Sequence, residues 1–362
     1  MDLTLSEEHR LLAESARNFV ERDCPTDLVR RLAADPDGFD PALWRSMAAL
    51  GWTGITIPGT AGGQGGGARE LAVLGEALGR GPVPSPLLAS TILAAGPIAR
   101  AGSADQRDRW VPALAAGTAV GTLAVVEAGA RDPWGTATMA GGETVSGTKI
   151  LVPWARTADV VVVVTRDGLF LVEPRRGHCT IQRHDDLGAD PLFALELVDA
   201  PAERLGSGGP DAHAAVLRRT LDLAGVVQFA FAVGAAERAL ELSVQHARDR
   251  HQFDRPIGSF QAVAHRCVDM RTDLDACRYL AYQAAWAVDR GGSADLEIAT
   301  ALAYGKDALR RIFVHAHQVH GAIGFSTEHD LHLFTLYAKA FELAYGSTPH
   351  HLERVAVAMG LG

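Results

Sequence analysis

The sequence predicts an α+β protein in which a sheet domain lies between two helical domains. Three successive zones of the chain differ in the spacing of their apolar residues. Residues 1–115 and 209–362 repeat apolar residues every three or four positions, which is typical of helices. Residues 116–208 instead carry β-branched runs separated by Gly, Asp and Pro, which is typical of strands. The order helix, sheet, helix therefore predicts three domains with these bounds.

The N-terminal zone is expected to be helical because Leu12, Ala16, Phe19 and Val20 form an apolar stripe at helical spacing. A glycine-rich tract at 62–67 precedes a second helical pattern. It lacks the Lys-Ser/Thr of a phosphate-binding P-loop, so we interpret it as a flexible turn.

The middle zone contains four β-branched runs, and they indicate a compact antiparallel sheet or barrel. The runs are residues 120–127, 149–153, 158–165 and 168–172. Residues 205–210, Leu-Gly-Ser-Gly-Gly-Pro, then predict a loop before the third zone, whose long Ala/Leu/Val-rich patterns have few helix breakers.

Composition excludes several classes of function. The formal net charge is −9 and the sequence has no basic cluster, which argues against nucleic-acid binding. No uninterrupted apolar run approaches 18 residues, so no membrane span is expected. The first ten residues do not resemble a signal peptide, and the four cysteines show no Cys-x-x-Cys spacing. We therefore expect a cytoplasmic protein with reduced thiols.

The most informative stretch is residues 250–261, Arg-His-Gln-Phe-Asp-Arg-Pro-Ile-Gly-Ser-Phe-Gln, which joins two long helical patterns. An Arg guanidinium can bind a phosphate through two parallel hydrogen bonds, and a nearby ring can stack on an adenine or flavin. The segment Pro256–Gly258 ends one helix and starts the next. An isolated Arg-x-x-Phe occurs by accident in many helices, so the block as a whole carries the prediction.

This block, together with Gln318-Val-His-Gly-Ala-Ile-Gly324-Phe, resembles the signature of the acyl-CoA dehydrogenase family. Residues 57–79, a glycine-rich loop and helix, resemble the N-terminal part of the same family. The resemblance implies a helical N-terminal domain, a middle β-barrel and a C-terminal four-helix bundle. It also implies FAD as cofactor, an acyl-CoA thioester as substrate and an electron-transfer flavoprotein as partner. The residues that it assigns to the adenine and pyrophosphate end of FAD, across a subunit interface, are Arg250, Phe253, Gln261, Gln318, Gly321 and Gly324.

The same resemblance exposes a missing catalytic base. In the family a carboxylate removes the substrate's α-proton while the flavin accepts a hydride. Here the usual base position is Tyr345, and the alternative position on an earlier helix is Ala224. A phenol has a pKa near 10 and alanine has no acceptor, so we assign no catalytic residue. Glu342, one helical turn away from Tyr345, and Asp222 remain open as relocated bases.

The middle domain departs from the family as well. Residues 126–132, Val-Glu-Ala-Gly-Ala-Arg-Asp, stand where the family has a hydroxyl-rich segment that holds the flavin and its pyrophosphate. Asp132 would place an anion near that pyrophosphate. Leu151-Val152-Pro153 stands for the family's Trp-x-Thr, and Pro153 has neither a hydroxyl nor an amide hydrogen to offer the flavin.

These losses fall on the catalytic side of the family's subunit interface, whereas the residues on the neighbour's side are intact. We therefore expect a non-catalytic subunit of a heteromeric acyl-CoA dehydrogenase, in a heterotetramer with a homologous catalytic subunit and one FAD per heterodimer. Residues 343–354 resemble base-less partner subunits of actinobacterial steroid side-chain dehydrogenases, which implies a steroid side-chain CoA ester. The alternatives are a self-sufficient homo-oligomer using Glu342 or Asp222, and a family-fold protein that binds CoA esters for other chemistry.

The histidines in the C-terminal zone are not expected to bind a metal. His315, His317 and His320 are close in sequence, as are His329 and His332, but no carboxylates accompany them at ligand spacing. The position of His320 between Gln318 and Gly321 instead predicts that it faces the cofactor's pyrophosphate.

Overall fold

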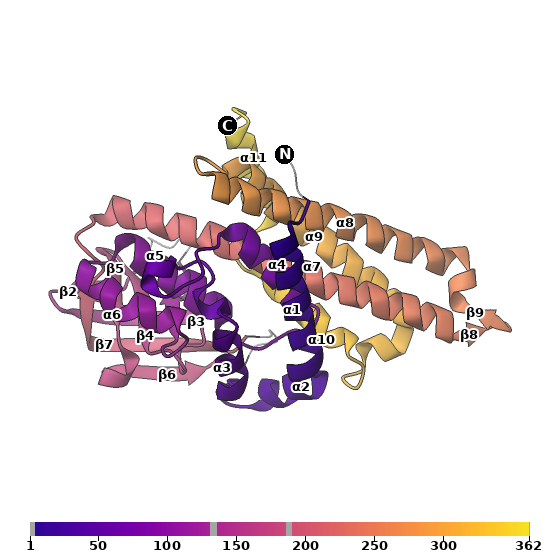
Figure 1. Ribbon diagram of the computed structural model, residues 1–362, viewed down its shortest axis with the longest axis horizontal. Coiled ribbons are helices and arrows are strands. Elements are labelled where there is room, and N and C mark those ends of the chain that lie inside the picture. Colours follow the sequence, from indigo (N-terminus) through magenta and orange to yellow (C-terminus); the bar gives the residue numbers. More distant parts are fainter. Residues whose placement is uncertain (1–3, 131–135, 186–189, 362) are drawn as a thin grey trace.

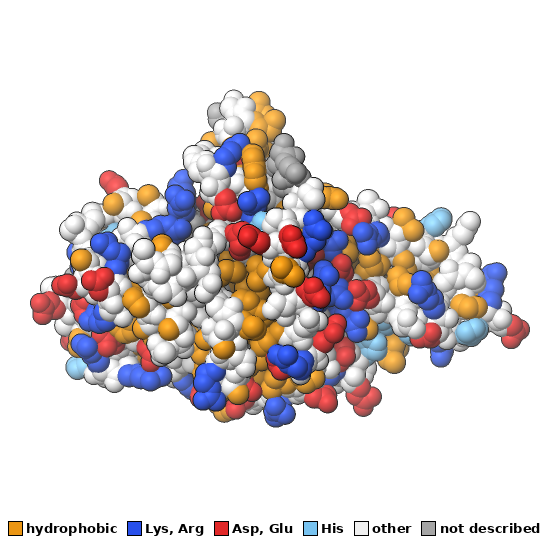
Figure 2. Space-filling model, viewed as in Figure 1, with side chains coloured by type: hydrophobic (Ala, Val, Ile, Leu, Met, Phe, Trp, Pro, Cys, Tyr) orange, Lys and Arg blue, Asp and Glu red, His pale blue; other side chains and the backbone are white. Residues whose placement is uncertain are grey.

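A computed structural model describes residues 4–130, 136–185 and 190–361, and it confirms the α+β class with its three parts. The sheet domain lies at one end of the elongated molecule, the C-terminal bundle forms the other end, and the N-terminal helices cross the junction between them (Figure 1). On the face shown in Figure 2, acidic and basic side chains are interspersed and form no continuous basic surface.

Six α-helices form the N-terminal part, and polar side chains cap several of them. Ser6 accepts a hydrogen bond from the His9 amide at the start of the first helix, and Asp40 accepts bonds from the amides of Ala42 and Leu43 at the start of the third. The helices are α1 (Glu7–Asp23), α2 (Thr26–Ala34), α3 (Pro41–Ala49), α4 (Ala68–Gly79), α5 (Ala95–Ala101) and α6 (Ala104–Ala115), with a π-helical turn at Ala89–Ala94 before α5.

The glycine-rich tract at 62–67 is a hydrogen-bonded turn rather than a flexible one. The amides of Gln64, Gly65 and Gly66 donate to carbonyls of residues 54–57. A side chain at Gly63 would meet the Ile57 carbonyl at 2.1 Å, so this backbone can only lie so close because the residue is glycine.

Outside residues 131–135 and 186–189, the middle part forms a seven-stranded sheet in which β1 and β4 are parallel and the other neighbouring strands are antiparallel. The strands are β1 (Gly121–Ala124), β2 (Met139–Gly141), β3 (Thr144–Pro153), β4 (Val160–Thr165), β5 (Gly168–Val172), β6 (Cys179–Arg183) and β7 (Leu192–Arg204). The order β1-β4-β5-β7-β3-β2 places the long β7 between β5 and β3, and β6 also pairs with β7.

Hydrogen bonds between β3 and the β1 region close this sheet into the expected barrel. The Ile150 amide donates to the Val126 carbonyl at 2.8 Å, and the Thr122 hydroxyl donates to the Pro153 carbonyl at 2.6 Å. The buried faces of the strands supply a core of their own, with Val161, Phe193 and Leu195 fully covered.

The C-terminal part is a helical bundle built around one helix of 40 residues, α7. Its elements are α7 (Pro210–Asp249), the hairpin strands β8 (His251–Gln252) and β9 (Arg255–Pro256), α8 (Gln261–Arg290), α9 (Asp295–His320), the 3₁₀ turn η6 (Gly321–Phe325), α10 (Leu331–Leu343) and α11 (Thr348–Ala358). Among the described helices, α7 alone is long and apolar enough to cross a membrane, but 83% of its apolar window is buried inside the molecule. It is the core helix of the bundle.

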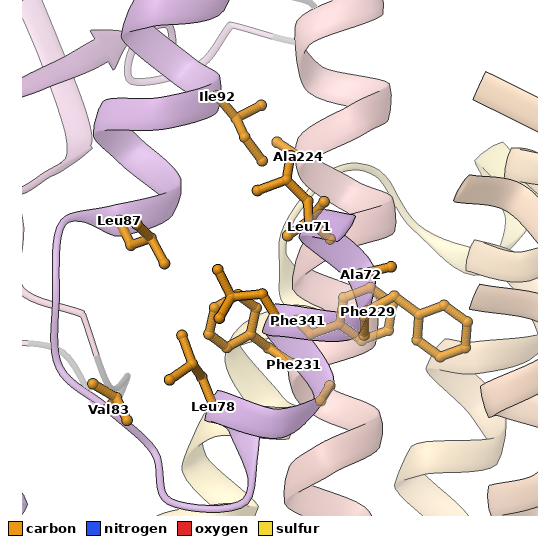
Figure 3. Close-up of a cluster of buried hydrophobic side chains, with 14 of the residues drawn as sticks. Leu71, Ala72, Leu78, Val83, Leu87, Ile92, Ala224, Phe229, Phe231 and Phe341 are labelled. Atoms are coloured by element: carbon orange, nitrogen blue, oxygen red, sulfur yellow. The ribbon is translucent and has the colours of Figure 1, made fainter. Parts of the chain in front are cut away.

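The N-terminal helices and the bundle share one hydrophobic core. Side chains from α4, the 83–92 segment, α7 and α10 pack together in Figure 3, and the Phe229 and Phe341 rings stack with centroids 5.2 Å apart. A buried ionic network reinforces this junction: Arg278 of α8 lies 2.6 Å from Glu76 of α4 and 2.7 Å from Glu237 of α7.

Candidate functional site

The Arg250 block forms a hairpin that projects from the far end of the bundle (Figure 1). Arg250 ends α7 in an extended conformation, and the two-residue turn Phe253-Asp254 joins β8 to β9. Both turn residues have positive φ, 54° and 61°, as a type I′ turn requires. A positive φ is unfavourable for an aromatic residue, so the backbone at Phe253 is strained. This conformation leaves the Phe253 side chain 84% exposed to solvent.

A second ring supports the exposed one. Phe260 lies edge-on to Phe253, with centroids 6.1 Å apart, and the Arg255 guanidinium stacks over Phe260 at 4.0 Å. Gly258 lets the corner fold back onto α7, because a side chain there would lie 3.0 Å from the Ala247 carbonyl. The block therefore presents a rigid aromatic surface at the tip of the bundle.

The polar residues of this block are available to a ligand. Gln261 is the first residue of α8 and is exposed. Arg250 is exposed too, and within residues 4–130, 136–185 and 190–361 no carboxylate lies within 4.0 Å of its guanidinium. An unpaired guanidinium beside an exposed ring is the arrangement that binding of a phosphate and an aromatic base requires.

The second predicted segment, which contains Gln318, Gly321 and Gly324, forms the end of α9 and the turn after it. Its two glycines are needed for different physical reasons. Gly321 takes φ 64° with ψ −141°, a conformation that side chains disfavour. A side chain at Gly324 would lie 3.0 Å from the His320 Cβ, so glycine is needed there for close packing. Gln318 is exposed on the last turn of α9.

Gln318 and Gly321 line a cavity of about 360 Å³ between α9 and α10. Its wall is largely apolar and carries two cations and one carboxylate at the end away from the turn. The lining residues are Leu309, Arg310, Phe313, Val314, His317, Gln318, Gly321, Phe325, Thr335, Ala338, Lys339 and Glu342.

The structure brings the two predicted segments to the same end of the bundle. The His246 ring, one turn before Arg250 on α7, stacks on the His320 ring of α9 with centroids 4.8 Å apart. His320 is only 5% exposed, and its ring lies between those of His246 and His329. It is therefore buried behind the predicted nucleotide-binding residues. In the described part of the chain, no His/Cys/Asp/Glu group has the arrangement of a metal site.

The two positions where the family places its base are neighbours in space. Ala224 is fully buried in α7, close to Leu71 and Ile92 (Figure 3). A side chain at the adjacent Gly225 would lie 3.4 Å from the Tyr345 Cβ, so the segment after α10 packs against this turn of α7. Burial, helped by the charge of Asp190, raises the pKa of Tyr345 further above its ordinary value. Neither position offers a proton acceptor at neutral pH.

The two carboxylates left open as relocated bases are both paired with cations. Glu342 forms an ion pair with Lys339 and lines the α9/α10 cavity. Asp222 accepts two hydrogen bonds from Arg354, at 2.8 and 3.1 Å. Both carboxylates are therefore already engaged by cationic side chains of this chain.

In the barrel, the segment that departs from the family is anchored by a buried ion pair. Lys149 Nζ, fully buried, lies 2.6 Å from the Glu127 carboxylate, which also accepts bonds from the hydroxyls of Thr136 and Thr138 and from the amide of Ala137. Burial opposes ionisation of Glu127, but these donors lower its pKa to about 2. Arg131 and Asp132 lie outside the described residues.

The strand that replaces the family's Trp-x-Thr turns an apolar side chain outwards. Leu151 sits at an irregularity of β3, with φ 54° and 46% of its surface exposed. The Pro153 carbonyl is already bound by Thr122. This face of the barrel therefore offers an apolar surface, and Pro153 has no donor for a flavin ring.

Sequence reasoning overlooked two buried lysines. One is Lys149, described above. The other is Lys306 of α9, whose ammonium group donates to the carbonyls of Phe341, Glu342 and Ala344 and so caps α10 just before Tyr345. Burial lowers the pKa of Lys306 to about 8. Lys149 is the one charged residue in a run of small and apolar residues, which was an available signal, whereas Lys306 is followed by Asp307 and gave none.

Comparisons with known proteins agree over the whole chain. The profile of "Acyl-CoA dehydrogenase, N-terminal domain" matches residues 6–118, and that of "Acyl-CoA dehydrogenase, C-terminal domain" matches residues 214–360. The acyl-CoA dehydrogenase FadE27 of Mycobacterium tuberculosis is 32% identical over 98% of both chains.

Two solved structures are similar to this chain at 30% identity. One is a chain of the ChsE4-ChsE5 complex from Mycobacterium tuberculosis, with a TM-score of 0.90 and complete coverage of both chains. The other is a chain of the Tcur3481-Tcur3483 steroid ACAD, G363A variant, with a TM-score of 0.88 and 99% coverage of both chains.

Proposed function

Because the chain belongs to the acyl-CoA dehydrogenase family, we propose that it is the non-catalytic subunit of a heteromeric, FAD-dependent acyl-CoA dehydrogenase. In this role it binds the adenine and pyrophosphate end of FAD for a homologous catalytic subunit. The assembly is a heterotetramer with one FAD per heterodimer.

One contrast between two regions of the molecule supports the proposal. At the far end of the bundle, Arg250 and Phe253 are exposed and ready for a ligand. At the position of the family's base, Ala224 is sealed in the core and Tyr345 is a phenol with a raised pKa. Loss of one region with retention of the other fits a subunit that works on its neighbour's cofactor.

The residues of this chain fit one end of FAD better than the other. Arg250 fits the pyrophosphate, Phe253 the adenine, and Gln318, Gln261 and the glycine turn the remaining polar atoms. The barrel face with Leu151 and Pro153 does not fit the flavin ring, which needs donors near its N5 side. When bound, FAD supplies the acceptor for the hydride from the acyl β-carbon.

The relatives support a more specific assignment of partner and substrate. The ChsE4-ChsE5 complex joins two different subunits, and the second structure is described as a steroid ACAD. We infer a steroid side-chain CoA thioester as substrate, an electron-transfer flavoprotein as electron acceptor, and a cytoplasmic location. A self-sufficient enzyme would need Glu342 or Asp222 as its base, and the ion pairs of both carboxylates argue against that alternative.

Co-expression with a homologous subunit that carries the family's glutamate tests the proposal. The purified complex should contain one FAD per heterodimer, and acyl-CoA should bleach the flavin under anaerobic conditions. The chain expressed alone should retain no flavin and show no dehydrogenase activity. A yellow, active homo-oligomer would reject the proposal in favour of a self-sufficient enzyme.

Substitution of Arg250 tests the nucleotide-binding role directly. A charge-assisted bond to a phosphate contributes about 1.5–3 kcal/mol, so Arg250→Ala should weaken FAD retention in the complex by about one to two orders of magnitude. Arg248→Ala is the matched control, since Arg248 is an equally exposed arginine two residues earlier on α7. Equal flavin content in both variants would remove Arg250 from the site.

A further inference from the structure

Three imidazole rings from separate elements meet at the end of α7 that carries Arg250: the His246 and His320 rings are stacked, and the His329 ring lies edge-on to His320. His246 belongs to the last turn of α7, His320 to the last turn of α9, and His329 to the segment before α10. Ring centroids are 4.8 Å apart both between His246 and His320 and between His320 and His329. We call these three residues the histidine stack.

One hydrogen bond determines which nitrogen of the neutral central ring carries the hydrogen. His320 Nδ1 donates to the Ala316 carbonyl at 2.8 Å, which leaves Nε2 as a bare acceptor. That Nε2 is buried and has no hydrogen-bond partner in the described part of the chain. His329 Nδ1, by contrast, accepts a hydrogen bond from the Leu331 amide. His320 Nε2 is therefore a ring nitrogen of the stack that is open to a proton.

The charges around the stack disfavour protonation while no anion is bound. The charges that act on His246 come from Asp249 and Arg250 on its own helix and from His329 before α10, and its ring contacts His320 of α9. His317 acts on His320, and Asp330 and His332 lie close to His329 in the chain. Asp330 is already neutralised by Arg30 of α2, 2.8 Å away. Burial, followed by the charges of His329 and Arg250, lowers the pKa of His246, and burial lowers that of His320 to about 4.

Two features of the fold would favour protonation once an anion arrives. The C-termini of α7 and α9 meet at the stack, and the negative end of a helix dipole stabilises a cation. An anion held by Arg250 adds to this effect, because the Arg250 charge is one of those that act on His246.

We propose that the histidine stack is a proton-linked part of a pyrophosphate site: when a pyrophosphate diester binds at Arg250, the stack takes up a proton and strengthens the binding. The inference rests on the proposed role of Arg250 in nucleotide binding. Because binding raises the depressed pKa of a histidine, the nucleotide should bind more tightly as the pH falls. The gain should appear below about pH 6.5, the ordinary pKa of histidine.

The size of the effect follows from that linkage. If binding returns one depressed histidine of the stack fully to its ordinary pKa near 6.5, affinity should be about tenfold higher at pH 5.5 than at pH 7.5. Close to one proton should be taken up for each nucleotide bound at pH 5.5. A site made of Arg250 alone would show neither effect, because arginine stays charged throughout this range.

Calorimetric titration of the full chain with ADP-ribose tests the proposal. This probe carries an adenosine pyrophosphate diester like that of FAD, and its phosphates do not titrate between pH 5 and pH 8. Repeating the titration in buffers of different ionisation enthalpy gives the number of protons taken up. The chain, His320→Asn, His246→Gln and the control His178→Asn are compared at pH 5.5 and pH 7.5. His178 is an exposed barrel residue with φ 63°, which asparagine tolerates.

The proposal expects about tenfold tighter binding at pH 5.5 for the unmodified chain and for His178→Asn, and a reduced pH dependence for both stack variants. His246→Gln keeps the test sound if the buried His320→Asn variant folds poorly. Binding that is independent of pH, without proton uptake, would overturn the inference and leave the role of Arg250 intact. Absence of ADP-ribose binding at either pH would also overturn the inference, and the flavin content of the co-expressed Arg250→Ala complex would then decide the role of Arg250.

Discussion

The buried pair Glu127–Lys149 offers the sharpest test of how this chain holds its altered flavin-side segment. Lys149→Met removes the only cation that touches Glu127 in the described residues and leaves a carboxylate inside the barrel. Breaking a buried pair by removing one partner typically costs about 3–5 kcal/mol. The donors from Thr136, Thr138 and Ala137 remain, so we expect the lower part of this range, about 3 kcal/mol.

A double-mutant cycle with Glu127→Gln separates the pair from its surroundings. Each single substitution leaves one buried charge unpaired, whereas the double variant Lys149→Met/Glu127→Gln leaves none. The double variant should therefore be less destabilised than the sum of the single ones, with a coupling of about 2 kcal/mol. Urea unfolding followed by circular dichroism and fluorescence measures each corner. The control is the exposed pair Arg109–Glu203, which joins α6 to β7 at 2.8 Å and whose loss should cost less than about 1 kcal/mol.

The same pair predicts a pH dependence with a definite sign. The pKa of Glu127 in the folded protein, about 2, lies below its ordinary value of 4.5, so the folded state binds this proton less readily than the unfolded chain. The stabilisation is therefore complete above about pH 4.5 and is lost as the pH falls towards 2. A cost of Lys149→Met no larger than that of the Arg109 control would show that the pair is hydrated, and the reasoning would fail.

Three further outcomes are expected. Gly324→Ala should destabilise the protein by about 1–3 kcal/mol in urea unfolding, because its new methyl group would press on His320 at 3.0 Å, whereas Ala322→Gly, at an exposed position in the same turn, should change stability little. Phe341→Ala should cost about 3–5 kcal/mol in the same assay through the cavity left beside Phe229, and a smaller value would mean that the core collapses around it. Tyr345→Glu should not make the isolated chain a dehydrogenase in an acyl-CoA assay, since the barrel face still lacks flavin donors, and activity in that variant would contradict the assignment of the subunit's role.

The sequence predicted the zones of this fold well because their periods differ. The runs at 158–165 and 168–172 became β4 and β5, as expected of buried β-branched segments. The longest described strand, β7, was missed because residues 192–204 contain a single β-branched residue, Val198, and also Pro201, which weakens a strand signal. Its pairing with β3, β5 and β6 decides the barrel, and pairing partners distant in sequence leave no local trace.

The parts of the site that lie in one short stretch of sequence could be predicted. The parts that combine residues from distant helices could not. Arg250 and Phe253 could be singled out because they share one short block with a turn-forming Pro and Gly. The stacking of His246 on His320 could not, since it depends on the ends of two helices 74 residues apart in the chain meeting in space. The free guanidinium of Arg250 and the ion pairs of Glu342 and Asp222 likewise depend on tertiary neighbours.

Because α7 is one uninterrupted helix, it keeps the position of the family's base far from the predicted nucleotide-binding residue. Ala224 and Arg250 are 26 residues apart on this one rod, about 39 Å at 1.5 Å per residue. A substitution at either position is therefore too far from the other to contact it. After a gene duplication, one copy could lose its catalytic base and keep its nucleotide-binding residues, provided that the other copy kept the base. The distance that α7 sets between the two positions thus allows two paralogues to divide these roles between them.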